Sequence, residues 1–431
     1  MGAVLSRAFL LLTVPLVAQN FAPELFGYWP IILAVATVAA PLALLRYDIA
    51  VPLEADDDSA RALLAVMLLA TAFLTGLLTI VCMLTPNLVL IGGAAQLPTH
   101  VRLAAPIYLF ATSITAIASA WLVRQRHYLA LSLSNSALGV TTLGGALLFP
   151  YIWGPSIEAL FGTFIFGVIV GMIVAVGAAI RAGALRNPYI AVSRMIISAK
   201  AYRVYPIYST PYSLSAVAFD RGIQFILSTA YGLSSLGLFY LVRQILFLPV
   251  NVCTTALRQV VFGYTASSGN MATRKQIIGS VAKPLFLVVP FASGFAEYTL
   301  HHQIALLLGE NWMAAADLVP PMVLHAGTLT ITAWLDRVFD LFGRQRLSVA
   351  LQIGSDFLQL ALAFALAAYG FAFIEFVWAV SMFAGAYNLL WLFIALRVAG
   401  FDWAVTALWL AGVVAFALIG IALGVTVARY I

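Results

Sequence analysis

Long apolar segments recur along the whole chain, separated by short polar stretches. A helix needs about 20 predominantly apolar residues to cross the hydrocarbon core of a bilayer. Segments of this kind lie near residues 3–20, 27–46, 62–84, 103–123, 129–149, 157–180, 207–230, 234–261, 277–299, 313–337, 347–368, 373–396 and 403–428. None alternates apolar and polar positions as the strands of a membrane β-barrel do. The pattern therefore predicts an all-α polytopic membrane protein with thirteen transmembrane helices, within a range of 12–14.

The composition agrees with this pattern. Hydrophobic residues make up 63% of the chain, and Asp, Glu, Lys and Arg only 9%, against about 25% charged residues in soluble domains. A soluble protein with so few polar residues could not cover its surface in water. The net charge of +6 therefore indicates unequal charge between loops, and we expect no nucleic-acid partner.

The basic residues indicate the orientation in the membrane. If the N-terminus is cytoplasmic, alternating helices leave two basic residues on the outer side, Arg102 and Arg429. The cytoplasmic ends then hold Arg46, Arg61, Arg124, Arg126, Arg181, Arg186, Arg194, Lys200, Arg203, Arg274, Lys275, Lys283, Arg344, Arg346 and Arg397. Because cytoplasmic loops carry excess Lys and Arg, this asymmetry predicts a cytoplasmic N-terminus.

A basic stretch divides the chain. We predict an N-terminal lobe of six helices (residues 1–180), a cytoplasmic linker (181–206), a C-terminal lobe of six helices (207–396) and an extra C-terminal helix (397–431). The lobes would surround a central cavity, and two tandem six-helix halves would be related by an axis along the membrane normal. Within the linker, Tyr189 to Arg203 is either an interfacial helix or a charged tether.

Charged residues inside predicted helices are candidates for a binding site, because they are costly in lipid. Asp220 and Arg221 precede a predicted turn near Gly232–Ser234, and Arg243 and Arg258 follow it. Arginine binds phosphate oxygens bidentately, so these residues could line a cavity for an anionic group. Alternatively, Asp220 and Arg243 form a structural ion pair, and Arg258 extends to the interface. Asp220 and Arg221 point about 100° apart on a helix and are not expected to pair.

A polar stripe follows one face of the eleventh predicted helix. Ser348, Gln352, Asp356 and Gln359 recur there at helical spacing. Asp356 is a candidate proton or cation site, with Gln352 and Gln359 beside it, because burial would raise the pKa of its carboxyl. The alternative is a hydrogen bond to a neighbouring helix. His325, in the middle of another helix, is interpreted as a packing residue.

Other chemistry has little support in the sequence. There is no GxxxxGK[ST] phosphate loop, no CxxC motif beside Cys82 or Cys253, and we expect no cofactor, no metal and no catalytic residue. Residues 56–58 contain a DxD, which suggests a metal-dependent sugar transferase, but no nucleotide-binding domain accompanies it. Asp58 or Ser59 is expected to cap the following helix.

Five segments resemble motifs of one family. They are Ala22-Pro-Glu-Leu-Phe-Gly27, Leu45-Arg-Tyr-Asp-Ile-Ala-Val-Pro-Leu53 with Asp56–Ala60, Tyr202-Arg-Val-Tyr-Pro-Ile-Tyr-Ser-Thr-Pro211, Gly237-Leu-Phe-Tyr-Leu-Val-Arg-Gln-Ile-Leu-Phe-Leu-Pro249, and Gly309-Glu-Asn-Trp-Met-Ala-Ala315. In order and at these spacings, they resemble the O-antigen-type flippases of polysaccharide biosynthesis. These belong to the superfamily of multidrug, oligosaccharidyl-lipid and polysaccharide exporters. The resemblance runs from about residue 4 to 400.

The resemblance implies a flippase that moves an undecaprenyl-pyrophosphate-linked oligosaccharide across the bacterial inner membrane by alternating access, driven by an ion gradient. It also implies that Arg243 lines the cavity, and that polysaccharide polymerase or assembly proteins are partners. Two positions depart from the family: Gln19 and Asn20 stand where an Arg is common, and Asp48 replaces the commoner Glu.

Two other functions stay open. A multidrug or organic-cation exporter of the same superfamily would have an acidic rather than a basic cavity in the first lobe. A membrane-embedded polysaccharide polymerase would need a large outer loop, which the sequence lacks. We expect a monomeric transporter in contact with membrane lipid, and no enzyme.

Overall fold

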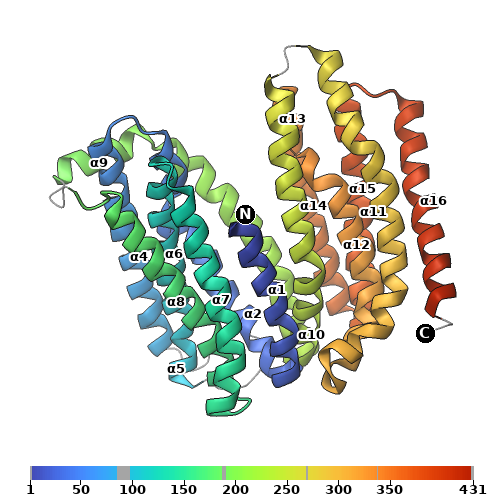
Figure 1. Cartoon of the computed structure of the whole chain (residues 1–431), viewed down its shortest axis with the longest axis horizontal. Coiled ribbons are helices and arrows are strands. Elements are labelled where there is room, and N and C mark those ends of the chain that lie inside the picture. The colour runs from blue at the N-terminus through green and yellow to red at the C-terminus, as the bar shows by residue number, and fades with distance from the viewer. Residues whose placement is uncertain (1, 85–97, 187–190, 268–269, 337, 429–431) are drawn as a thin grey trace. The chain divides into compact units, whose positions relative to one another are not determined.

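The computed structural model describes residues 2–84, 98–186, 191–267, 270–336 and 338–428, and within these ranges the chain is helical without strands (Figure 1). The chain divides into two compact units, Met1–Gly237 and Leu238–Ile431. Residues 207–237 thus pack with the first unit, so the units divide later in the chain than the predicted linker at 181–206. The predicted lobe limits remain a prediction.

The first unit is built on six long helices and the first part of a seventh. Its long helices are α1 (Gly2–Asn20), α2 (Pro23–Leu44), α4 (Asp57–Leu84), α6 (Ala104–Arg124), α7 (Tyr128–Trp153), α8 (Ile157–Arg181) and the beginning of α10 (Thr210–Ser267). Shorter elements join them: α3 (Tyr47–Ala50), η1 (Val51–Leu53), α5 (Thr99–Arg102), α9 (Val192–Ala201) and a π-helical turn, η2 (Tyr205–Ser209).

The second unit begins within α10. It continues through α11 (Met271–Leu308), η3 (Glu310–Leu318), α12 (Val319–Thr332), η4 (Ala333–Leu335), α13 (Val338–Leu341), α14 (Gln345–Ala368), α15 (Phe373–Val398) and α16 (Trp403–Ala428). The last helix packs along α11, where a Cβ atom at Gly294 or Gly420 would overlap a carbonyl oxygen of the other helix. Small residues permit such close approach in membrane helices.

The predicted segments match the helices. Eleven helical stretches among the described residues are long and apolar enough to cross a membrane. One of them, Tyr205–Arg258, contains a non-helical residue at Gly232 and corresponds to two predicted segments. The first predicted segment corresponds to α1. The prediction of an all-α polytopic membrane protein is confirmed, and the turn falls at Gly232 as expected.

The turn of α10 packs against the beginning of α2 in the first unit. A Cβ atom at Gly27 would overlap the carbonyl oxygen of Leu233, and one at Gly237 would overlap the carbonyl oxygen of Pro23. Gly27 and Gly237 belong to two of the sequence motifs quoted above. The positions of these two glycines in their motifs are therefore explained by a reciprocal contact. The backbones of α2 and α10 touch there without side chains between them.

The segment between α2 and α4 is folded back on the unit. Tyr47 and Val51 are buried in a core with Leu63, Met67 and Trp121. Helix α4 begins at Asp57. Its cap is Asp56, whose Oδ2 accepts hydrogen bonds from the backbone N–H of Ser59 at 2.9 Å and from its hydroxyl at 2.7 Å.

The expectation that Asp58 or Ser59 caps this helix is therefore wrong. An N-cap side chain must reach the N–H two or three residues ahead, and Asp56 is the residue that precedes the first helical turn. Asp58 already lies within that turn, and it is paired with arginine.

Candidate functional site

Arg221 is held inside the first unit by neutral partners. It lies in α10, and its Nε donates to the hydroxyl of Thr37 on α2 at 3.1 Å. Its Nη1 donates to Oε1 of Gln224 at 2.9 Å, and the Gln224 side chain is buried. Thr37 in turn donates to the carbonyl oxygen of Leu33 at 2.6 Å. These bonds orient the guanidinium without neutralising its charge.

Asp220 lies beside Arg221, contrary to expectation. Its Oδ2 is 3.8 Å from Arg221 Nε, because the long arginine side chain bends toward its neighbour. The two side chains are 36% and 19% exposed, and an ion pair at this distance is weak. Thr37 and Gln224 are therefore the closer polar partners of Arg221.

Arg243 lies in the second unit, in an aromatic setting. Its guanidinium carbon is 5.8 Å from the ring centroid of Phe247, within the range of a cation–π contact. Phe247 meets His325 edge to face, with ring centroids 5.0 Å apart. His325 thus packs against an aromatic ring, in agreement with its interpretation as a packing residue. Because Asp220 and Arg243 belong to different units, their pairing remains a prediction.

Arg258 joins α10 to the end of α12. Its Nε is 3.0 Å from Oδ1 of Asp336, and its Nη2 donates to the carbonyl oxygen of Ala333 at 3.0 Å. This contact fits a structural tie between two helices better than extension to the membrane surface. The assignment of Arg258 to a substrate cavity remains a prediction.

The polar stripe of α14 contains a hydrogen-bonded pair. Nε2 of Gln352 donates to Oδ1 of Asp356 at 2.9 Å. Gln359 is half-buried on the same helix, three residues after Asp356 and thus on the same side. On the neighbouring helix α15, the hydroxyl of Tyr387 donates to the carbonyl oxygen of Leu351 at 2.7 Å. Asp356 is therefore hydrogen-bonded within its own helix, and its role in ion coupling remains a prediction.

A second charged cluster lies at one end of the first unit, around the DxD. Arg124 binds Oδ1 of Asp57 at 2.8 Å, and Asp58 binds both Arg61 at 2.8 Å and Arg194 of α9 at 2.9 Å. Arg61 also lies over the ring of Trp121. Asp57 and Asp58 thus each have an arginine partner. These ion pairs tie the start of α4 to α6 and α9, which favours a structural role for the two carboxylates over a metal site.

The hydrogen bonds from Ser59 hold the pKa of the Asp56 carboxyl below its usual value. Burial raises the pKa of the Asp48 carboxyl, although Arg46 at 3.6 Å opposes the shift. Asp56 is consequently ionised at neutral pH and serves as a charged helix cap.

Arg429, which the charge distribution assigns to the outer side, lies outside the described residues. Within the described part of the chain, no three His, Cys, Asp or Glu side chains group closely enough to hold a metal ion.

Two partners of Arg221 were missed in the sequence. Gln224 follows Arg221 by three residues, a helical spacing that could have indicated the contact. Thr37 lies 184 residues away, and no local signal connects the two. Likewise, the amide of Asn388 donates to Thr328 at 3.2 Å across 60 residues, and neither residue had been singled out.

Long apolar helices with hydrogen-bonded arginines inside them define a multi-pass membrane protein. The profile of a family described as "Polysaccharide biosynthesis protein" matches residues 17–317. The chain belongs to this family. No curated protein matched the sequence.

Three solved structures share the fold. A lipid II flippase, MurJ, in an inward closed conformation is similar with a TM-score of 0.78 and 14% identity, over 100% of this chain and 92% of that one. An inward-facing multidrug resistance MATE transporter of the MOP superfamily has a TM-score of 0.68 and 14% identity, over 92% and 98%. A MOP superfamily transporter from Pyrococcus furiosus, whose binding pocket is described as reversed in polarity, has a TM-score of 0.59 and 13% identity, over 92% and 98%.

Proposed function

We propose that this protein is a flippase that carries an undecaprenyl-pyrophosphate-linked oligosaccharide across the bacterial inner membrane by alternating access, coupled to an ion gradient. Its N-terminus lies in the cytoplasm, and the protein acts as a monomer beside polysaccharide polymerase or assembly proteins. Membership of the polysaccharide biosynthesis family and the fold shared with a lipid II flippase support this proposal.

The observation that carries the proposal is the position of Arg221. A guanidinium in a membrane-spanning segment costs about 2.5–3.5 kcal/mol on insertion scales. Here its hydrogen bonds go to Thr37 and Gln224, which are neutral, and the Asp220 carboxylate is 3.8 Å from its Nε. These two hydrogen bonds leave several of the five guanidinium N–H donors for another acceptor. A pyrophosphate group is such an acceptor, because arginine binds phosphate oxygens bidentately.

The test is translocation in proteoliposomes. Wild-type protein is expected to move an undecaprenyl-pyrophosphate-linked oligosaccharide, and Arg221→Gln or Arg243→Ala is expected to lower the rate at least about tenfold, the effect of about 1.4 kcal/mol. Arg181→Gln, which removes an exposed arginine at the end of α8, is the matched control and should transport normally. Monodisperse elution in detergent and an unchanged melting temperature establish that each variant is folded.

The outcomes separate the assignments. If the wild type transports and both variants are unaffected, the arginines are structural and only the family-based part of the proposal survives. If the wild type moves no lipid-linked sugar with or without an ion gradient, the flippase proposal is wrong. In that case Arg243 has no role in substrate binding, and its contact with Phe247 is a packing contact.

The coupling residues are tested in the same vesicles. Asp356, hydrogen-bonded to Gln352 and followed on its face by Gln359, is the proposed ion site. Asp356→Asn should abolish the stimulation of transport by an ion gradient and leave downhill exchange intact. Glu310→Gln, at an exposed carboxylate, should keep the stimulation. Equal stimulation in wild type and Asp356→Asn would place the ion elsewhere.

A multidrug or organic-cation exporter is the alternative, supported by the fold shared with MATE transporters. Such a protein would bind cations in a cavity with net negative charge. In the spanning part of α10, Arg221 and Arg243 accompany one carboxylate, Asp220, which lies 3.8 Å from Arg221. This excess of positive charge favours an anion instead. Ion-driven efflux of a cationic dye, together with no transport of lipid-linked sugar, would favour the exporter.

A further inference from the structure

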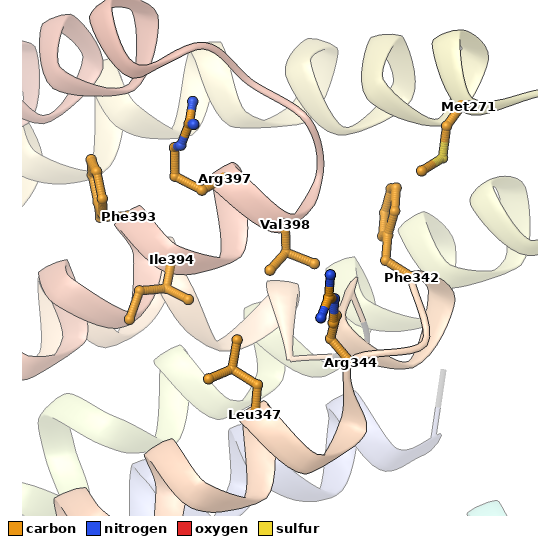
Figure 2. A pocket seen from close by; sticks show the side chains of 8 residues that line it. All are labelled: Met271, Phe342, Arg344, Leu347, Phe393, Ile394, Arg397 and Val398. Carbon is orange, nitrogen blue, oxygen red and sulfur yellow. The ribbon is translucent and has the colours of Figure 1, made fainter.

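A cavity with a positively charged lining lies within the second unit, and neither Arg221 nor Arg243 lines it. It has a volume of about 450 Å³ and is lined by Met271, Phe342, Arg344, Leu347, Phe393, Ile394, Arg397 and Val398 (Figure 2). This volume is within the range of small-molecule sites, about 300–1,000 Å³. Among the described residues, the lining contains two arginines and no carboxylate. The proposed transport function does not use this cavity.

The two arginines come from different elements. Arg344 immediately precedes α14, and Arg397 belongs to the last turn of α15. Nη1 of Arg397 donates to the carbonyl oxygen of Phe401 at 2.7 Å, which orients this guanidinium and uses one of its five N–H donors. Two guanidinium groups at one cavity repel each other, and a bound anion would relieve that repulsion.

More positive charge lies next to the cavity. Nζ of Lys275 is 5.2 Å from the ring centroid of Phe401, the residue whose carbonyl oxygen binds Arg397. Arg274 donates to the carbonyl oxygen of Leu341 at 3.2 Å. Asp402, which follows Phe401 in the chain, is an exposed carboxylate. The local charge therefore favours an anionic ligand.

The apolar part of the lining indicates what kind of anion would bind. Phe393 packs edge to face against Trp403, with ring centroids 4.9 Å apart. Trp403 is 65% exposed at the first residue of α16, and exposed tryptophans at the ends of membrane helices mark the headgroup level. Leu347 and Ile394 line the same cavity. A ligand here would meet guanidinium groups and hydrocarbon together.

We propose that this cavity binds the headgroup phosphate of an anionic phospholipid, with its acyl chains along Leu347 and Phe393. Basic pockets between helices on the cytoplasmic side recognise such headgroups. Arg344 and Arg397 both lie at ends that the distribution of basic residues assigns to the cytoplasm. A soluble phosphate would use the same guanidiniums but would gain nothing from the apolar residues.

The experiment measures lipid binding to the full chain in neutral detergent, by native mass spectrometry and by the shift in melting temperature. The probes are phosphatidylglycerol, phosphatidylcholine with the same acyl chains, and sn-glycerol 3-phosphate. Phosphatidylglycerol should bind and raise the melting temperature, and the other two should not. Arg344→Gln should weaken phosphatidylglycerol binding about tenfold, which corresponds to about 1.4 kcal/mol, and Arg344→Lys should retain part of it.

Arg346→Gln is the matched control, because Arg346 is an exposed arginine two residues away that does not line the cavity. It should change binding less than about twofold, about 0.4 kcal/mol. If Arg344→Gln and Arg346→Gln weakened phosphatidylglycerol binding equally, general surface charge would explain the binding and the proposed site would be wrong. Equal binding of phosphatidylglycerol and phosphatidylcholine would also contradict the proposal. If glycerol 3-phosphate bound as tightly as phosphatidylglycerol, the ligand would be a soluble phosphate and the lipid proposal would be wrong.

Discussion

Arginine side chains in the spanning segments have different kinds of partner. The hydrogen bonds of Arg221 go to a hydroxyl and an amide, with the Asp220 carboxylate farther away at 3.8 Å, whereas Arg258 is 3.0 Å from the carboxylate of Asp336. The same residue type therefore has two roles, set by its partners. A charge held by neutral groups stays available to a ligand, and a charge held by a carboxylate joins two helices.

Glycine has an equally specific role at the contact between α2 and α10. Gly237→Ala is expected to lower stability by about 1–3 kcal/mol, the usual effect of overpacking, because its methyl group would overlap the carbonyl oxygen of Pro23. Backbone cannot move aside as a flexible side chain can. The measurement is the melting temperature of the purified protein in detergent.

Gly76→Ala is the control for this prediction. Gly76 lies in α4, and no atom lies within 4 Å of a Cβ added there. Alanine favours the helix over glycine by about 1 kcal/mol, so this variant should melt at the same or a higher temperature. Equal destabilisation by the two substitutions would show that the close contact of Gly237 has no specific importance.

The loop between α2 and α4 depends on one arginine from another element. Arg124 ends α6, and its side chain is 10% exposed. It donates to Asp57 at 2.8 Å, to the carbonyl oxygens of Val51 and Ala55 at 3.3 and 3.0 Å, and to that of Glu54. A single guanidinium thus satisfies several carbonyl groups that the short 3₁₀ turn leaves without helical partners.

Arg124→Gln should therefore destabilise the protein by about 1–3 kcal/mol, the cost of leaving buried polar groups unsatisfied. Limited proteolysis should then cut the segment 51–57 faster than in the wild type, and the melting temperature should fall. Arg126→Gln removes an exposed arginine two residues away and should have neither effect. Unchanged proteolysis in Arg124→Gln would mean that the loop is held by its buried residues alone.

In the complete molecule, the charge asymmetry of the loops predicts how the chain lies in the bilayer. The ends predicted to be cytoplasmic hold far more Lys and Arg than the predicted outer ends, and such a bias sets orientation during insertion. With a cytoplasmic N-terminus, α9 lies inside the cell and the turn between α14 and α15 lies outside.

Cysteine labelling tests this orientation in a background where Cys82 and Cys253 are replaced by serine. Tyr369→Cys should react with a membrane-impermeant maleimide in intact cells, since Tyr369 is exposed beyond the end of α14. Ser193→Cys, exposed on α9, should react after permeabilisation alone. The reverse pattern would contradict the predicted topology.

Most of the fold was predictable because each helix satisfies its own backbone in lipid. With no water in the bilayer core, a spanning segment must be helical, and its length and hydropathy are local properties. That is why the predicted segments, the turn at Gly232 and the membrane class agree with the structure. The pairing of Gln352 with Asp356 was likewise accessible, because the two residues are separated by one helical turn.

Contacts between distant residues could not be read from the amino-acid order. Thr37 reaches Arg221, Arg258 reaches Asp336, and Arg344 shares a cavity with Arg397 only after the helices have packed. Hydropathy alone does not indicate which particular helix faces meet. Packing of small residues and hydrogen bonds between particular side chains settle that choice, and these depend on the positions of atoms far apart in the chain.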